Sequence, residues 1–125
     1  MLQDGFHDVP NGKLAIVVRE LEMRAAPAAR IPSFADGITL RAVTDPTLDW
    51  YRDIFRRVGA DWLWFSRLGM DDDALSGIIH DPDVVIFTLT KDGKDEALLE
   101  LDFRTADTCE LMFFGLTAPL IGTGA

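Results

Sequence analysis

The sequence predicts an α+β domain with a mainly antiparallel sheet and helices packed on it. Strand-like runs rich in β-branched and apolar residues recur at 38–43, 83–90, 97–104 and 109–116. Two segments with helical spacing of apolar residues lie together between the first run and the second. Short turn signals, such as Asp92-Gly93, separate the later runs and indicate hairpins. The predicted order is β-α-α-β-β-β followed by the start of a helix, with an N-terminal strand or hairpin before it.

The first 36 residues are expected to form an N-terminal strand segment and a Pro/Ala linker, and residues 37–125 the domain itself. Lys13–Met23 has a β-branched centre, which favours a strand at a sheet edge or in a solvated hairpin. In the following Ala25–Ser33, Pro27 and Pro32 disfavour both a helix and a strand ladder.

Two helices are predicted after the strand Ile38–Val43. Asp45 or Thr47 is suited to cap the first, and Gly59 ends it. Its apolar residues fall on one face at helical spacing: Leu48, Tyr51, Ile54, Phe55 and Val58. Asp71–His80 is predicted as the second helix, since its three leading aspartates suit a helix N-terminus.

The last two predicted strands carry most of the chemistry-bearing candidates. On Ala97–Arg104, Glu100 and Asp102 alternate with apolar residues and therefore share one face of the strand. We expect that face to be solvated, although it would also suit the border of a substrate site. Cys109–Leu116 is too apolar to alternate cleanly, and Cys109 is expected to be a small buried residue at its start.

Composition and charge limit the classes of function. The net charge is −9, and the residues after Asp36 carry 16 of the 21 acidic side chains but only eight of the 12 basic ones. Nucleic acid is therefore not an expected partner, whereas cationic or amine substrates are favoured by steering. A single cysteine and two distant histidines indicate neither a disulfide framework nor a metal site. No apolar run approaches the roughly 20 residues that span a bilayer, so no membrane association is expected and a cytoplasmic location is the default expectation.

The C-terminal stretch Cys109–Ala125 has the pattern of a buried strand followed by a turn and a glycine-rich helix start. Gly115 indicates a bulge or a close backbone approach, and Pro119 suits the entrance to a helix. The small residues of Gly122-Thr123-Gly124 leave backbone amides free to face a phosphate. A glycine-rich tail left over from a loop is the alternative interpretation.

This stretch resembles the central segment of the GNAT superfamily of N-acetyltransferases. In that family a strand with a catalytic glutamate runs into an Arg/Gln-x-x-Gly-x-Gly/Ala loop. Gly124 fits the first glycine of the loop, with Gly122 as an extra one, while Ile121 departs from the Arg/Gln position. The resemblance covers about Gly37–Ala125 and implies the N-terminal half of the fold. It also implies a chain that ends inside the acetyl-CoA pyrophosphate loop and that is inactive by itself.

The resemblance implies acetyl transfer from acetyl-CoA to an amine of a small molecule or peptide, with no metal. Glu110 takes the position of the catalytic base, the alternative being a strand-end glutamate that points to solvent. Main-chain groups of Phe114, Gly115 and Leu116 would hold the pantetheine arm. The pyrophosphate would meet the amides of Gly122, Thr123, Gly124 and Ala125. The acceptor pocket is built in the family near the positions of Trp62, Trp64 and Phe65, of which at least two are also expected to pack in the core.

Two alternatives to an enzyme remain at this point. One is a non-catalytic module that binds a ligand or a partner on the same strand scaffold, and the other is a complete small structural domain. In either case the strand Cys109–Leu116 is expected to present an exposed edge. Self-association through that edge, or its covering by Lys13–Met23, is predicted.

Overall fold

The chain divides into two compact units, Met1–Ile31 and Pro32–Ala125. The structure is a computed structural model that describes residues 4–30 and 33–124. In the first unit, residues 4–30 form no helix or strand, and every one of them is exposed. The strand expected at Lys13–Met23 is therefore wrong. A single strand leaves its backbone groups unpaired and its apolar side chains in water, as Val17 shows with an exposed fraction of 93%.

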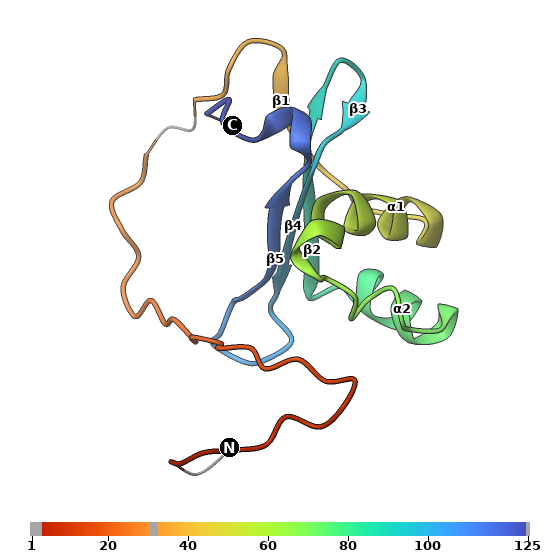
Figure 1. The fold of residues 1–125 in the computed structure, drawn as a ribbon. Helices are drawn as coiled ribbons and strands as arrows, with labels where there is room; N and C mark the ends of the chain where they lie inside the picture. The colour runs from red at the N-terminus through yellow and green to blue at the C-terminus, as the bar shows by residue number, and fades with distance from the viewer. Residues whose placement is uncertain (1–3, 31–32, 125) are drawn as a thin grey trace. The chain divides into compact units, whose positions relative to one another are not determined.

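The second unit is an α+β domain, as the sequence predicts (Figure 1). Its elements follow one another as β1 (Ile38–Ala42), α1 (Leu48–Gly59), a 3₁₀ turn (Ala60–Trp62), α2 (Asp72–Ile79), β2 (Val84–Lys91), β3 (Lys94–Asp95), β4 (Ala97–Asp102), β5 (Glu110–Leu116) and a second 3₁₀ turn (Ala118–Leu120). The two-residue β3 is an addition to the predicted order. The expected helix start after β5 is a 3₁₀ turn, with Pro119 in its first positions.

The strands form one antiparallel sheet in the order β1-β2-β4-β5, with β3 paired to β2 beside this path. The tight turn between β2 and β3 has positive φ at Asp92 (50°) and Gly93 (75°), as a type I′ hairpin requires. Among the described strands, β5 pairs only with β4 and β1 only with β2. Both are therefore edge strands, and β5 has one row of backbone groups without a strand beside it.

Both helices lie on one face of the sheet, which we call the covered face (Figure 1). Thr47 caps α1 by accepting a hydrogen bond from the Trp50 amide at 3.2 Å, and Asp71 caps α2 through the Ala74 amide at 2.8 Å. The helices begin where the sequence predicts for this reason. The main core forms between the helices and the sheet from Tyr51, Ile54, Phe55, Val58, Leu75, Ile79, Val84, Ile86 and Leu98.

The opposite face, which we call the open face, is apolar but only partly covered. At one end Leu120 is fully buried against Ile38, Leu89 and Ala97. Away from that end, Leu40 and Phe114 remain 50% and 66% exposed. A hollow of about 210 Å³ lies on this face between the side chains of Leu40, Phe87, Leu99, Phe114 and their neighbours. The open face is thus a hydrophobic surface in contact with solvent.

Glu100 and Asp102 lie on the covered face, so the expectation of a solvated face is wrong. Their exposed fractions are 0% and 8%. The apolar residues that alternate with them, Leu99 and Leu101, lie on the open face and are only half-buried. Cys109 is likewise exposed rather than buried, because β5 begins one residue later.

No helix within residues 4–30 and 33–124 is long and apolar enough to cross a membrane.

Candidate functional site

Glu110 is the first residue of β5 and lies at the rim of a polar hollow. Its Cα is paired in the sheet with that of Asp102 on β4. The hollow has a volume of about 310 Å³ and is lined by Asp102, Arg104, Thr105, Thr108, Glu110 and Met112. Within the described part of the chain the Glu110 carboxylate has no ion-pair partner and is exposed. A carboxylate in this position is free to contact a ligand that enters the hollow.

Asp102 and Arg104 form a fixed ion pair on the wall of the same hollow. The Arg104 guanidinium donates to Asp102 at 2.5 Å (Nη2–Oδ2) and 3.0 Å (Nε–Oδ1), and the Arg104 amide donates to Oδ1 at 2.9 Å. These hydrogen bonds from Arg104 hold the pKa of Asp102 below its ordinary value, and the carboxylate in turn raises the pKa of Arg104. The site therefore presents one neutralised ion pair beside the free carboxylate of Glu110.

A β-bulge near Glu110 changes the direction of β5. Glu100 is paired with Phe113 and Leu101 with Leu111, so Met112 is the extra residue on β5. The bulge brings Glu110 onto the covered side, level with Asp102, and places Leu111 and Phe114 on the open face. The sequence indicates a bulge or a close approach at Gly115. The bulge lies three residues earlier, at Met112.

At Gly115 the backbone of β5 lies close to helix α1. A Cβ atom there would lie 2.4 Å from Val58 Cγ1 and 3.2 Å from Trp64 Cη2. The close approach expected from the lone glycine is therefore present, although it concerns a helix and an indole ring of the domain itself. The edge of β5 that faces away from β4, which includes Phe114, Gly115 and Leu116, has no neighbouring strand in the described residues.

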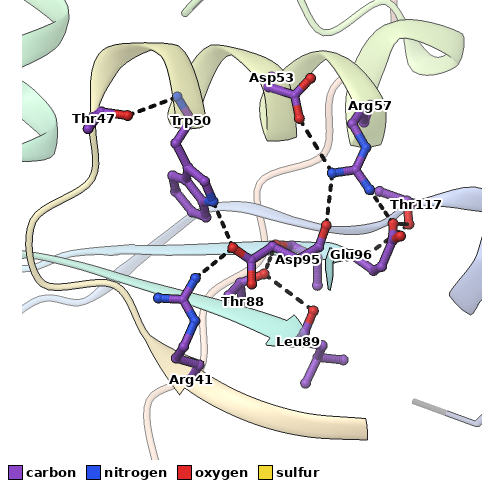
Figure 2. Close-up of polar contacts among 11 residues, drawn as sticks. Arg41, Thr47, Trp50, Asp53, Arg57, Thr88, Leu89, Asp95, Glu96 and Thr117 are labelled. Carbon is purple, nitrogen blue, oxygen red and sulfur yellow. Dashed lines mark hydrogen bonds and ion pairs between the residues drawn. The ribbon is translucent and has the colours of Figure 1, made fainter. Parts of the chain in front are cut away.

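The C-terminal end of β5 is held by a cluster of polar contacts that Figure 2 shows. Glu96 accepts hydrogen bonds from the Thr117 hydroxyl and from the Arg57 guanidinium of α1, and the Thr117 amide donates to the Glu96 carbonyl at 2.9 Å (Figure 2). Arg57 also donates to the Asp95 carbonyl at 2.8 Å. The direction in which the chain leaves β5 is thus fixed by α1 and by the β3–β4 junction.

Asp95 extends this cluster to α1 and β1. Its carboxylate accepts hydrogen bonds from Trp50 Nε1 at 2.8 Å and from Arg41 at 2.6 Å (Figure 2). It also accepts one from the Thr90 hydroxyl at 3.1 Å. Partial burial raises the pKa of Asp95, but the hydrogen bonds from Trp50, Thr90 and Arg41 outweigh it and lower the pKa overall. The cluster is a structural clamp, since every carboxylate in it is used by the domain's own side chains.

The expected pyrophosphate loop forms a tight turn after the second 3₁₀ element. Gly122 and Gly124 both have positive φ, 79° and 80°. The Thr123 amide donates to the Leu120 carbonyl at 3.2 Å and its hydroxyl to the same oxygen at 2.8 Å, so this amide is used within the turn. Gly122 and Gly124 are exposed. Ala125, the last residue of the expected loop, lies outside the described residues.

The three aromatic residues expected near an acceptor pocket lie in different surroundings. Trp64 packs in the core, with its ring centroid 5.6 Å from that of Phe55 and 5.1 Å from that of Phe113. Trp62 and Phe65 are 69% and 76% exposed. The expectation that at least two of them pack in the core is therefore wrong, because the 3₁₀ turn after α1 directs only Trp64 inward.

The structure also contains a buried polar cluster that sequence reasoning missed. Tyr51 on α1 donates a hydrogen bond to Glu100, and Arg67 pairs with the same carboxylate at 2.5 Å. All three side chains are buried, and the Arg67 guanidinium lies 5.3 Å from the centre of the Phe113 ring. Burial, and then the neighbouring Glu100 carboxylate, raise the pKa of Tyr51 well above its ordinary value. The only sequence signal was a glutamate at an alternating position between apolar residues.

The structure brings Glu110 together with Asp102 and Arg104, and it separates Glu110 from the glycine turn. Glu110 and Leu116 are the two ends of β5, and a seven-residue strand spans about 20 Å. The exposed edge of β5 connects the hollow at Glu110 to the turn that holds Gly122 and Gly124. No group of three or more His, Cys, Asp or Glu side chains within the described ranges is arranged to bind a metal ion.

Comparisons of the chain with protein-family models, with curated proteins and with solved structures find no match.

Proposed function

We propose that this chain is an acetyl-CoA-dependent N-acetyltransferase domain in which Glu110 is the general base. The observation that carries the proposal is the position of Glu110: an exposed carboxylate without an ion-pair partner in the described residues, at the rim of a polar hollow, on the first residue of an edge strand. An ammonium ion has no lone pair with which to attack a thioester, so a base is required at neutral pH. Glu110 is the carboxylate in this hollow that the domain does not use itself.

The open edge of β5 provides a binding mode for an extended cosubstrate. The pantetheine arm of acetyl-CoA contains amide groups, which can pair with the main chain of an edge strand as a peptide does. About 20 Å of strand separates Glu110 from Leu116, and the exposed residues Gly122 and Gly124 follow. We therefore place the thioester near Glu110 and the pyrophosphate near the turn 121–124. Such a cosubstrate is consistent with a cytoplasmic protein.

The charges around the polar hollow favour a cationic acceptor substrate. A cationic amine that enters beside Glu110 would meet one free carboxylate, whereas the second carboxylate, Asp102, is already paired with Arg104. The net charge of −9 favours the approach of a cation over that of an anion. We therefore favour a small amine or a lysine-like side chain as the acceptor.

The variant Glu110→Gln tests the role of Glu110. It keeps the size of the side chain but removes the proton acceptor. Because general-base assistance is typically worth about 10²–10⁴-fold, we expect kcat with acetyl-CoA and an amine to fall at least about tenfold at neutral pH when the substitution is made in the full-length protein. The loss should shrink as the pH approaches the pKa of the amine, since more of the substrate then arrives deprotonated.

Binding and turnover have to be measured on the same preparations. Acetyl-CoA affinity should be unchanged in E110Q, because the main chain of β5 and not this side chain holds the cosubstrate. Asp107→Asn is a matched control, since it removes an exposed carboxylate from the same β4–β5 loop but outside the residues that line the hollow. A near-normal kcat in E110Q would remove Glu110 from the mechanism, and an equal loss in both variants would show a general effect of charge.

A second candidate is a non-catalytic binding module, which the apolar hollow on the open face favours. That hollow, of about 210 Å³, lies between Leu40, Phe87, Leu99 and Phe114 and offers no charged side chain to a ligand. An apolar ligand that perturbs these residues, in a protein that does not bind acetyl-CoA, would support this candidate over the enzyme.

A further inference from the structure

The polar hollow beside Glu110 has hydrogen-bond donors as well as acceptors on its wall. Arg104 uses Nε and Nη2 to bind the Asp102 carboxylate, at 3.0 Å and 2.5 Å. Its third guanidinium nitrogen, Nη1, has no hydrogen-bond partner within residues 4–30 and 33–124. The Arg104 side chain is 39% exposed and lines the hollow. The two N–H groups of Nη1 are therefore available to a ligand.

Glu110 and the Arg104 guanidinium are neighbours that do not contact each other. Glu110 is paired across the sheet with Asp102, and the Cβ atoms of directly opposed residues lie about 4.5–5.5 Å apart on one face. Asp102 in turn holds the guanidinium, and both Glu110 and Arg104 line the hollow. No ion pair joins them in the part of the chain that the structure describes, so a small ligand can bridge the two side chains.

The carboxylates around Arg104 disfavour an anionic group as its ligand. Asp102 already neutralises the guanidinium, and its hydrogen bonds are the largest cause of the raised pKa of Arg104. The Asp81 and Glu100 carboxylates raise that pKa further. Since Glu110 adds another negative charge to the wall, the free donors of Arg104 suit the oxygen of a neutral group, such as a carbonyl or a hydroxyl, better than a carboxylate.

We propose that the hollow binds a cationic amine that carries a neutral hydrogen-bond-accepting oxygen close to its nitrogen. The ammonium group contacts the Glu110 carboxylate, and the oxygen accepts a hydrogen bond from Arg104 Nη1, which makes Arg104 the specificity-determining residue. The inference deepens the proposed function and rests on it in one respect, namely that Glu110 contacts the amine.

Two further side chains of the hollow fit such a ligand. The Thr105 hydroxyl is exposed and forms no hydrogen bond with another residue of the described ranges, so it is a second donor for the oxygen. The half-buried Met112 provides an apolar surface for the carbon atoms between the two polar groups. Together these contacts favour a compact, polar amine over a long alkylamine.

Titrations of the ¹⁵N-labelled full chain with four matched compounds measure the two contacts separately. L-Alaninamide, L-alaninol, L-alanine and isopropylamine differ in one substituent: an amide, a hydroxymethyl, a carboxylate or a methyl group. At about pH 6 all four carry a protonated amine, and Glu110 is ionised. Amide shifts of residues 102–112 follow binding without any acetyl transfer.

We expect the dissociation constants of alaninamide and alaninol to be at least about threefold lower than that of isopropylamine, as one additional hydrogen bond predicts. L-Alanine should bind no more tightly than isopropylamine, because its carboxylate meets the carboxylates of the hollow. A gain with only one of the first two compounds would identify the oxygen as that of a carbonyl or of a hydroxyl.

Two variants separate the role of Arg104 from that of Glu110. Arg104→Gln should bring the ratio of the alaninamide and isopropylamine constants to about one. It also frees Asp102 to attract every cation, so the double variant with Asp102→Asn preserves the charge of the wild-type pair and should show the same ratio. Glu110→Gln should weaken all amines by about two- to fivefold and leave the ratio as in the wild type. Circular dichroism shows whether each variant is folded.

Arg56→Gln is a matched control, since it removes an exposed arginine that does not line the hollow. It should leave every dissociation constant within about twofold of the wild type. Equal binding of alaninamide, alaninol and isopropylamine, a ratio that persists in R104Q, or tight binding of L-alanine would overturn the proposal but leave Glu110 as the base. Absence of binding by every amine would overturn it together with the acceptor site of the proposed function.

Discussion

The two faces of the sheet differ in what their side chains contact. On the covered face, apolar residues from α1 and α2 surround a carboxylate, Glu100, which is fully buried and is satisfied by Tyr51 and Arg67. The open face has leucine and phenylalanine side chains at the corresponding alternate positions, and Leu40 and Phe114 remain half-exposed or more. On β4, the acidic residues Glu100 and Asp102 are thus inside, together with Leu98, whereas Leu99 and Leu101 lie on the open face. For these four residues after Leu98 the arrangement is the reverse of the usual one.

The difference shows that alternation of polar and apolar residues along a strand defines two faces but does not decide which of them is buried. That decision depends on the other elements: Tyr51 and Arg67 provide a donor and a cation for Glu100, so its burial is compensated. Within residues 33–124 the open face has no such element over it, apart from the 3₁₀ turn that carries Leu120. The apolar side chains left there make the open face and the adjoining β5 edge the most available surfaces for binding.

Removal of the buried carboxylate should have the largest effect on stability. Glu100→Ala leaves the Arg67 guanidinium buried without its partner and the Tyr51 hydroxyl without an acceptor. Loss of one partner of a buried pair typically costs about 3–5 kcal/mol, which is a large part of the stability of a small domain. Urea unfolding monitored by circular dichroism measures the change in the free energy of unfolding.

A triple variant tests whether the stability loss in E100A comes from the unpaired buried groups. It combines Tyr51→Phe, Arg67→Met and Glu100→Leu. It replaces all three polar side chains by apolar ones of similar size, and such replacements are often neutral or stabilising. We expect it to recover most of the stability that E100A loses. If E100A is as stable as the wild type, the covered face does not depend on this cluster and the comparison of the two faces fails.

Substitutions at the neighbouring residues Phe114 and Gly115 of β5 should change the stability of the domain by different amounts, because the two residues lie on opposite faces of the sheet. In Gly115→Ala the new Cβ atom would lie 2.4 Å from Val58 Cγ1, and overpacking of this kind costs about 1–3 kcal/mol. In Phe114→Ala the side chain removed is 66% exposed, so the free energy of unfolding of the monomer should change by about 0.5 kcal/mol or less. Thermal unfolding at low protein concentration and low salt compares the two variants, and equal losses would contradict the assignment of faces.

The smallest expected effect on stability is its dependence on acidic pH, to which Asp95 and Asp102 contribute. Their pKa values are lowered in the folded protein, so their ionised forms stabilise the fold. This contribution is complete above the ordinary aspartate pKa of about 3.9 and is lost as the pH falls through the lower folded-state values. Asp95→Asn should therefore reduce stability at pH 6 but make its decline between about pH 4 and pH 2 shallower. An unchanged slope of stability against pH in D95N would exclude Asp95 from the acid transition.

Much of the fold could be predicted from local signals in the sequence. Helix α1 begins after Thr47 because its hydroxyl caps the helix, and the Asp92-Gly93 turn has the positive φ angles that these two residues favour. The pairing of Asp102 with Glu110, which builds the polar hollow, could not be predicted, because register across a seven-residue loop is set by long-range packing and by the bulge at Met112. The same holds for Arg67, which reaches Glu100 from an irregular segment between the helices.

Local propensity failed where a segment had no partner. The β-branched residues of Lys13–Met23 favour a strand, yet residues 4–30 form none, because a strand is stable only beside another strand. Glu110, by contrast, was selected by its place before an apolar strand, and it does lie at a hollow. Sequence could place it at the start of the strand but could not identify Asp102, Arg104, Thr105 and Thr108 as its neighbours.

The most direct test of the proposed function is a titration of the ¹⁵N-labelled chain with acetyl-CoA, followed by amide chemical shifts. We expect shifts along residues 112–116 and 121–124, and none along the central strand β2, whose two edges are already paired with β1 and β4. No shift at about 1 mM acetyl-CoA, or shifts confined to Leu40, Phe87 and the other residues of the apolar hollow, would contradict acetyl-CoA binding at the edge of β5.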